Sequence, residues 1–352
     1  ALIGGIDSKI DLSFGEISSA DGNLRDFVAR LERSGGTLKI ERLAAIAGED
    51  LSLAAEGAVT TDAGRMSGAI RYTVEAESAA AVDRFVTFAG LATESAELKR
   101  IVGRSAPMRL SGFLDLGRNG EGGARLLADG IAGDTRIELV ARSEGLSAAE
   151  VGGHQLDLSL LVSAAASGAV VGQIFGMSPP VVDAGAAVPA GPGSASIHAS
   201  GVPEKGLNIL ARLADGGLAA ELEGQLTRRE AGSDFDGTVA VQTVESRMLL
   251  ALAGLAPGPA AAVAAIDGEA AGRTPVKRGL IMRGRLAKRS DSYHLTDVKG
   301  AIDGSPLTGS LAVDLSGPGR LFALSARMAK LDLPAILAPL LRARDVAAGG
   351  GG

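Results

Sequence analysis

The sequence predicts a mainly β fold: an elongated antiparallel sheet built from two repeats, with a few short helices. Three observations support this. Apolar and polar residues alternate along most of the 352-residue chain, glycine-containing turn dipeptides separate the alternating segments, and helical spacing is rare. A strand that alternates in this way has one apolar and one wet face, which is typical of antiparallel sheets. Roughly 16 strands of common length fit the chain.

Alternation is clearest in three segments. In 134–142, Ile137 and Leu139 share a face opposite Arg136 and Glu138. Segments 156–162 and 305–316 alternate in the same way, and their apolar positions are Leu156, Leu158, Leu160 and Val162, then Leu307, Leu311, Val313 and Leu315. Each segment is therefore predicted to be a strand with one apolar face.

Asp-Gly dipeptides mark the predicted hairpin turns, because glycine adopts a positive φ at little cost. They are Asp21-Gly22, Asp129-Gly130, Asp215-Gly216, Asp236-Gly237 and Asp303-Gly304. The 50 glycines follow no strict period, which excludes collagen. Aromatic residues are only 3% of the chain, so the bulk of any core must come from Leu, Ile and Val.

The predicted helices are short and expose a duplication. Helical spacing is found near 79–103 and 167–176, and again at 244–255 and 334–342. The segments around the first and third of these recur at an offset of roughly 165–172 residues, which indicates an internal repeat. We therefore expect a first repeat unit at 1–177, a Pro/Gly/Ala-rich joint at 178–193, a second repeat unit at 194–343 and a flexible tail at 344–352.

Composition argues against several functional classes. The net charge of −6, without a basic block, argues against a nucleic-acid partner. There is no cysteine, and His154, His198 and His294 are scattered without ligand spacing, so we expect no metal site. Asp234–Gly237 is closest to a calcium loop but lacks the later acidic ligand. With no catalytic constellation, we expect neither an enzyme nor a cofactor.

The last quarter of the chain resembles a known family. The segment 302–318 (IDGSPLTGSLAVDLSGP), followed by Lys330-Leu331-Asp332-Leu333-Pro334, is similar to the C-terminal region of the AsmA-like family. That resemblance implies a long, strongly curled antiparallel sheet with an apolar inner groove. It also implies a periplasmic location in Gram-negative bacteria, a role in outer-membrane lipid homeostasis, and an inner-membrane anchor. No apolar stretch long enough to span a bilayer occurs in the chain, so we expect the anchor in a segment outside it.

Two functions fit these expectations. The first is a non-enzymatic lipid-handling scaffold that holds the acyl chains of phospholipid or another lipid on an apolar groove. Its candidate lining residues are Ile137, Leu139, Leu156, Leu158, Leu160, Leu307, Leu311, Val313, Leu315, Phe322 and Leu324. The second is a structural module that binds cell-envelope proteins and has a dry core, as in a sandwich or barrel. The two differ in whether part of the apolar face is left for a ligand.

Overall fold

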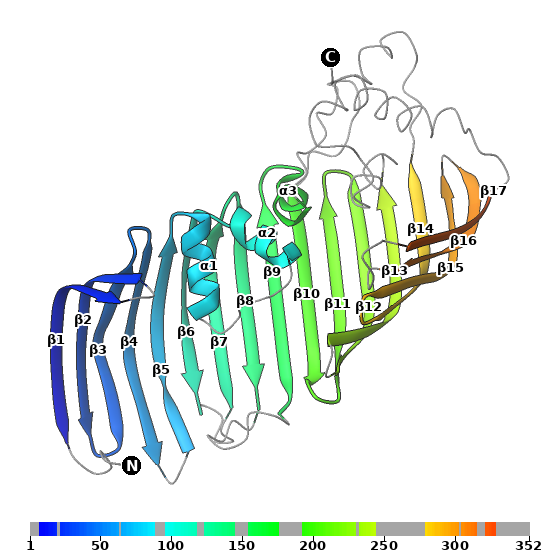
Figure 1. Ribbon diagram of the computed structural model, residues 1–352. Helices are drawn as coiled ribbons and strands as arrows, with labels where there is room; N and C mark the ends of the chain where they lie inside the picture. The colour runs from blue at the N-terminus through cyan, green and yellow to red at the C-terminus, as the bar shows by residue number, and fades with distance from the viewer. Residues whose placement is uncertain are drawn as a thin grey trace, which may run out of the picture. The chain divides into compact units, whose positions relative to one another are not determined.

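The computed structural model describes residues 7–19, 22–62, 65–88, 96–117, 123–144, 154–175, 192–229, 232–243, 279–302, 304–314 and 321–328. Within these residues the chain has three helices and one antiparallel sheet of 17 strands that is not closed (Figure 1). The predicted mainly β fold, with a long, curled antiparallel sheet and few helices, is confirmed. The predicted helices at 244–255 and 334–342, most of the joint and the tail lie outside the described residues.

The chain divides into two compact units. Unit 1 comprises 1–165 and 194–209, and unit 2 comprises 166–193 and 210–352. These units do not coincide with the predicted repeats. Residues 166–177 lie in unit 2 rather than with the first repeat, and residues 194–209 lie in unit 1 rather than with the second. The repeat boundaries stay a prediction. Unit 1 contains β1 (Ser8–Ser19), β2 (Gly22–Ser34), β3 (Thr37–Ala47), β4 (Leu51–Asp62), β5 (Arg65–Ala76), α1 (Ala79–Phe88), α2 (Ala96–Arg104), β6 (Met108–Leu116), β7 (Ala124–Ala132), β8 (Thr135–Ser143), β9 (Leu156–Ala164) and nearly all of β10 (Gly193–Val202).

Unit 2 begins with a helix and continues with strands. The boundary between the two residue ranges falls within β11 (Gly206–Asp215), after Ile209. The remaining elements are α3 (Ala169–Phe175), β12 (Leu218–Arg229), β13 (Gly232–Thr243), β14 (Leu280–Arg289), β15 (Ser292–Ile302), β16 (Ser305–Asp314) and β17 (Leu321–Met328).

Strands that follow one another in the sequence pair antiparallel, from β1 to β9 and again from β12 to β17. The turn prediction for the Asp-Gly dipeptides was only partly right. Asp215-Gly216 stands where β11 turns into β12, but Asp129-Gly130 lies inside β7 and Asp236-Gly237 lies inside β13. The dipeptide also suits a strand wherever two backbones approach closely, because glycine has no Cβ.

Close backbone approach is clearest at the glycine pair of unit 2. Gly224 and Gly237 lie directly opposite each other on β12 and β13. A Cβ on Gly237 would stand 2.2 Å from the Glu223 carbonyl oxygen, and the Phe235 ring covers both glycines. Register shifts follow in β14 and β15, and Figure 1 shows the strands from β12 to β15 bent along their length. Glycine kinks and β-bulges are the usual means of curving a sheet.

Each unit buries a small cluster where a helix meets strand ends. In unit 1, Val82 of α1 packs with a cluster of strand residues that are at most 5% exposed: Leu51, Val74, Ala76, Met108 and Ala132. In unit 2, Val171 of α3 packs with Leu218, the first residue of β12. The core is thus concentrated beneath the helices.

Charged and hydroxyl side chains hold these helices in place. The Ser78 hydroxyl accepts a hydrogen bond of 3.1 Å from the Ala81 amide, which caps the start of α1. The Asp50 carboxylate accepts hydrogen bonds from the Ser78 hydroxyl and from the Arg84 guanidinium. In unit 2, the buried Asp215 carboxylate accepts from the backbone amides of Gly168 (2.5 Å) and Val171 (2.8 Å) at the start of α3.

Candidate functional site

One face of unit 1 is apolar from β4 to β9. The strand registers place alternate residues of the six strands on this face, and none of them is Lys, Arg, Asp or Glu. We call it the unit 1 apolar face. Its larger residues are Leu51, Leu53, Val59, Met66, Ile70, Tyr72, Val74, Met108, Leu110, Leu114, Leu116, Leu126, Ile137, Leu139, Leu156, Leu158, Leu160 and Val162.

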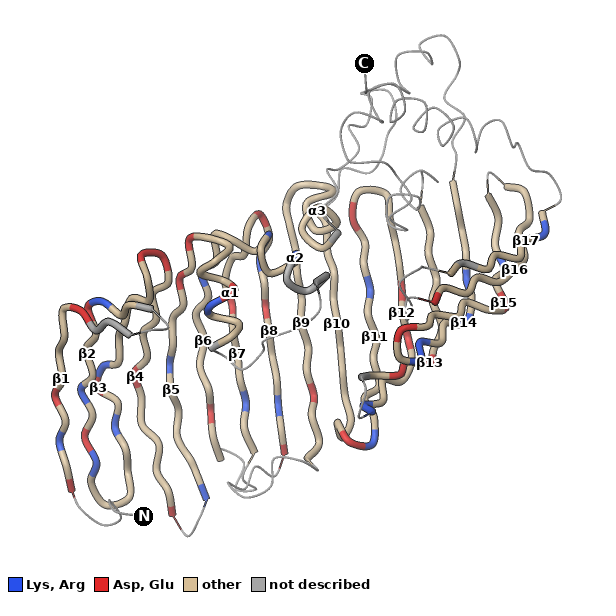
Figure 2. Tube along the Cα trace, viewed as in Figure 1, with Lys and Arg blue, Asp and Glu red and all other residues tan. Residues whose placement is uncertain are grey.

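The opposite face of unit 1 carries the charges, which recur along its strands in Figure 2. Arg71 pairs with Glu56 at 2.9 Å, and Arg136 pairs with Asp129 at 2.7 Å. These side chains are more than half exposed, so each pair adds little to the stability of the fold. The hydrogen bond from Lys39 lowers the pKa of Glu41. This face is a solvated surface with compensated charge.

Among the described residues, a helix covers one end of the unit 1 apolar face. Helix α1 packs on β4 and β5, and we call the residues beneath it, Leu51, Val74, Ala76, Met108 and Ala132, the covered end. In the described residues of β1–β9, the substantial strand-to-strand contacts join hydrogen-bonded neighbours, so no second sheet layer lies over this face. Leu139, Leu156, Leu158 and Leu160, which we call the uncovered part, are half-buried by their neighbours within the sheet.

The structure brings the five predicted groove residues of the first repeat onto this one face. Ile137 and Leu139 of β8 pair with Val162 and Leu160 of β9, and Leu158 and Leu156 continue the row. Ile137 also borders the cluster beneath α1. Sequence reasoning left out Leu110, Leu114 and Leu126, which lie on the same face. The alternation in β6 and β7 was the signal that would have found them.

The predicted residues of the second repeat lie on the apolar face of unit 2. Leu307 pairs with Met328, Leu311 with Leu324, and Val313 with Phe322. Leu307, Leu311 and Val313 are half-buried, whereas Leu324 on the last strand is 75% exposed. Leu315 lies outside the described residues, and so does the side chain of Phe322. The unit 2 apolar face, from β12 to β17, also holds Leu222, Val239, Met282 and Leu286. Its described residues include no carboxylate, but Lys288 of β14 lies on this face beside Tyr293.

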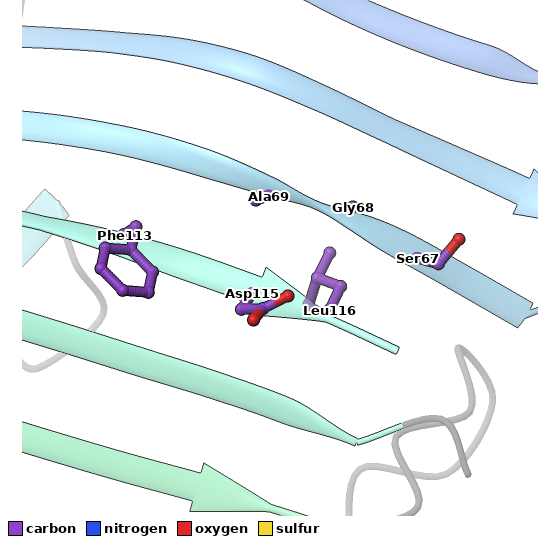
Figure 3. Close-up of a pocket in the computed structure, with 6 residues that line it drawn as sticks. All are labelled: Ser67, Gly68, Ala69, Phe113, Asp115 and Leu116. Atoms are coloured by element: carbon purple, nitrogen blue, oxygen red, sulfur yellow. The ribbon is translucent and has the colours of Figure 1, made fainter. Parts of the chain in front are cut away.

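A shallow hollow of about 440 Å³ lies at the kink of β5, and Figure 3 shows its lining. Ser67, Gly68 and Ala69 come from β5, and Phe113, Asp115 and Leu116 come from β6. Gly68 has a φ of +143°, and a Cβ there would stand 2.1 Å from the Ala58 carbonyl oxygen. Among its described lining residues, Asp115 is the one titratable group.

The three histidines lie in or beside strands, apart from one another in sequence. His154 precedes β9 and is half-buried, and His198 of β10 and His294 of β15 are exposed. Among the described residues, no group of three or more His, Cys, Asp or Glu side chains is placed to hold a metal ion. In the same part of the chain, no helix is both long and apolar enough to cross a membrane.

Comparison with family models, with curated proteins and with solved structures finds no match for this chain.

Proposed function

We propose that this chain is a non-enzymatic lipid-handling scaffold that holds acyl chains against its apolar faces. The observation that supports this proposal is the uncharged unit 1 apolar face, which runs through six strands and which, within the described part of the chain, a helix covers at one end. Contiguous apolar area beyond a few hundred Å² marks an interaction site in a folded protein.

An acyl chain suits this face better than a compact polar ligand. Six strands at about 4.8 Å spacing make a surface about 24 Å wide, and nine residues of strand extend about 30 Å. Those dimensions accommodate an extended hydrocarbon chain. The face offers no charged side chain to orient a polar ligand, and burial of a methylene contributes about 0.8 kcal/mol without any directional contact.

The resemblance of 302–318 to the AsmA-like family favours phospholipid as the ligand and the periplasm as the location. In this proposal the chain supports phospholipid transport or outer-membrane biogenesis, and a segment outside it provides the inner-membrane anchor. Cell-envelope proteins are its further partners.

Lipid that co-purifies with the protein tests the proposal, measured by native mass spectrometry and by solvent extraction. Val313 lies on the unit 2 apolar face, opposite Tyr293 on β15. We expect Val313→Asp to stay folded and to lose bound lipid, because a carboxylate on an open face can remain in water while it repels hydrocarbon. The matched control is Ser310→Asp on the other face of the same strand, which should retain both the fold and the lipid.

The alternative function is a structural module that binds an envelope protein and no lipid. The covered end of unit 1 favours it, because there the apolar residues are sealed by α1 rather than left for a ligand. This alternative predicts a protein free of lipid. It also predicts that Val313→Asp unfolds the chain while Ser310→Asp does not, and that result would reject the lipid proposal.

A further inference from the structure

Two basic residues lie on the unit 2 apolar face, at the same end of its strands. Lys288 of β14 is opposite Phe235 of β13, and Arg228 of β12 is opposite Ser233 of β13. Ser233 and Phe235 are each an even number of residues from Val239, so all three share the apolar face of β13. Arg228 and Lys288 are each the penultimate residue of their strand, and the two cations therefore mark one end of this face.

The positions of the two cations allow both to contact one anion. The Lys288 ammonium donates a hydrogen bond of 2.8 Å to the backbone carbonyl oxygen of Ser233, which is the residue opposite Arg228. Directly opposed residues on antiparallel strands have Cα atoms about 4.5–5.5 Å apart, well within the reach of an arginine side chain. The Lys288 Nζ atom also lies 5.9 Å from the centre of the Tyr293 ring. An ammonium has three N–H groups, so two remain for a ligand after the bond to Ser233.

No acid neutralises these two cations in the part of the chain that the structure describes. Neither forms an ion pair there, and Asp291 in the turn after β14 contacts neither of them. The Asp236 carboxylate of β13 lies on the opposite face, where Arg285 contacts it at 3.0 Å. A charge on a largely apolar surface costs free energy unless a counter-charge reaches it. A bound anion would supply that counter-charge.

The rest of the unit 2 apolar face is suited to hydrocarbon. At the far end of β12, its first residue Leu218 packs with Val171 of α3. Leu222 and Leu226 lie between Leu218 and Arg228 on the same face of β12, and ten residues of strand extend about 33 Å. The face therefore has a cationic end and an apolar length, which are the two parts that an anionic lipid needs. The described residues of the unit 1 apolar face have no such cationic end.

We propose that unit 2 binds a lipid with a phosphate headgroup, which Arg228 and Lys288 hold while the acyl chain lies along the leucines of the unit 2 apolar face. This inference rests on the proposed lipid function and adds the charge of the ligand and the place of its headgroup. The guanidinium can donate two parallel hydrogen bonds to phosphate, and the ammonium adds a point charge. A neutral lipid would gain the apolar contacts alone.

The experiment compares two probes that share one acyl glycerol and differ only in phosphate: oleoyl lysophosphatidate and monoolein. Calorimetry measures the binding of each to delipidated protein. We expect lysophosphatidate to bind at least about tenfold more tightly, because charge-assisted hydrogen bonds to phosphate are strong. The double variant Arg228→Met, Lys288→Met should lose this preference and keep its affinity for monoolein, since methionine retains an unbranched apolar side chain.

Two further variants make the comparison specific. Arg228→Met alone should lose part of the preference, and it removes no hydrogen bond between described residues, so it tests the site even if the double variant misfolds. The matched control is Arg283→Met, which removes an exposed cation from the other face of β14 and should retain the full preference. Circular dichroism verifies that each variant stays folded.

Several results would overturn the proposal. Equal affinity of the wild type for the two lipids, an unchanged preference in both Arg228 variants, or an equal loss in Arg283→Met would reject the headgroup site and leave the lipid scaffold standing. Inorganic phosphate that binds as tightly as lysophosphatidate would assign the cations to free phosphate. Failure of both lipids to bind would reject the proposed lipid function, and the headgroup site with it.

Discussion

The two ends of the unit 1 apolar face differ in cover although they share the same strands and the same residue types. At the covered end, Val74 and Leu51 are at most 3% exposed beneath α1. In the uncovered part, Leu139 and Leu158 are half-buried, and their shielding comes from neighbours within the sheet. Apolar alternation therefore marks a face for burial, while the helix decides which part of it becomes core. The remainder is where the proposed lipid would lie.

A carboxylate should separate the two ends most strongly. Val74→Asp places an unpaired charge in the helix-covered core, so we expect the free energy of unfolding to fall by several kcal/mol. Leu139→Asp leaves its charge in contact with water, and we expect a loss of about 1 kcal/mol or less. Chemical denaturation measures both. Thr73→Asp on the charged face of β5 is the control, and equal losses at Val74 and Leu139 would mean that the whole face is packed.

Truncation of leucine gives the second largest contrast. Leu51→Ala leaves a cavity beneath α1 and should destabilise unit 1 by about 2–5 kcal/mol. Leu158→Ala removes a side chain that is already partly in water, so its cost should be about 1 kcal/mol. Thermal unfolding of the two variants provides the comparison. A larger loss of stability for Leu158→Ala than for Leu51→Ala would contradict the conclusion that no second sheet layer lies over β9.

Loss of the helix cap should weaken the cover without altering the sheet. Ser78→Ala removes the acceptor of the Ala81 amide, at a cost of about 1 kcal/mol. We expect faster hydrogen exchange in α1 and at the covered end, with unchanged exchange in β8 and β9. Ser78→Asp restores an acceptor for the amide but places a second carboxylate beside Asp50, so Ser78→Thr is the better conservative control.

Acid should have the smallest effect on the cover. The Ser78 hydroxyl, and then the Arg84 guanidinium, hold the pKa of Asp50 below its usual range. A depressed carboxylate pKa stabilises the fold above the unfolded pKa of about 3.9, and this contribution is lost as the pH falls through the lower folded value. We expect exchange in α1 to rise below about pH 4 in the wild type. In Asp50→Asn this acid-dependent component should be absent.

The sequence was a good guide to the strands and a poor guide to their cover. The pattern at 134–142 predicted a strand, and β8 spans Thr135–Ser143 with Ile137 and Leu139 on the apolar face. Alternation defines the two faces because side chains point to opposite sides with a period of two. It does not say what lies above a face, which depends on contacts between residues far apart in the sequence, as between Leu51 and Val82.

The Asp-Gly dipeptides also show that a local pattern does not determine where a residue lies in the sheet. Asp215-Gly216 and Asp236-Gly237 are the same dipeptide, and the first ends a strand while the second lies in mid-strand opposite Gly224. The dipeptide alone cannot distinguish a turn, where Gly216 has a φ of +57°, from a close approach of two strand backbones, as at Gly237, because both use the missing Cβ. Alternation thus predicted which residues share a face of the sheet, whereas the dipeptide pattern did not predict which glycines lie in mid-strand.

Pairing between sequence neighbours has a consequence for how the chain folds. From β1 to β9, and from β12 to β17, each strand is hydrogen-bonded to the strands before and after it in the sequence. Loop closure between neighbours costs little entropy, so hairpins can form early and extend one strand at a time. Such a one-dimensional chain of hairpins loses its cooperativity gradually, and β1 should open long before β5, which α1 holds down.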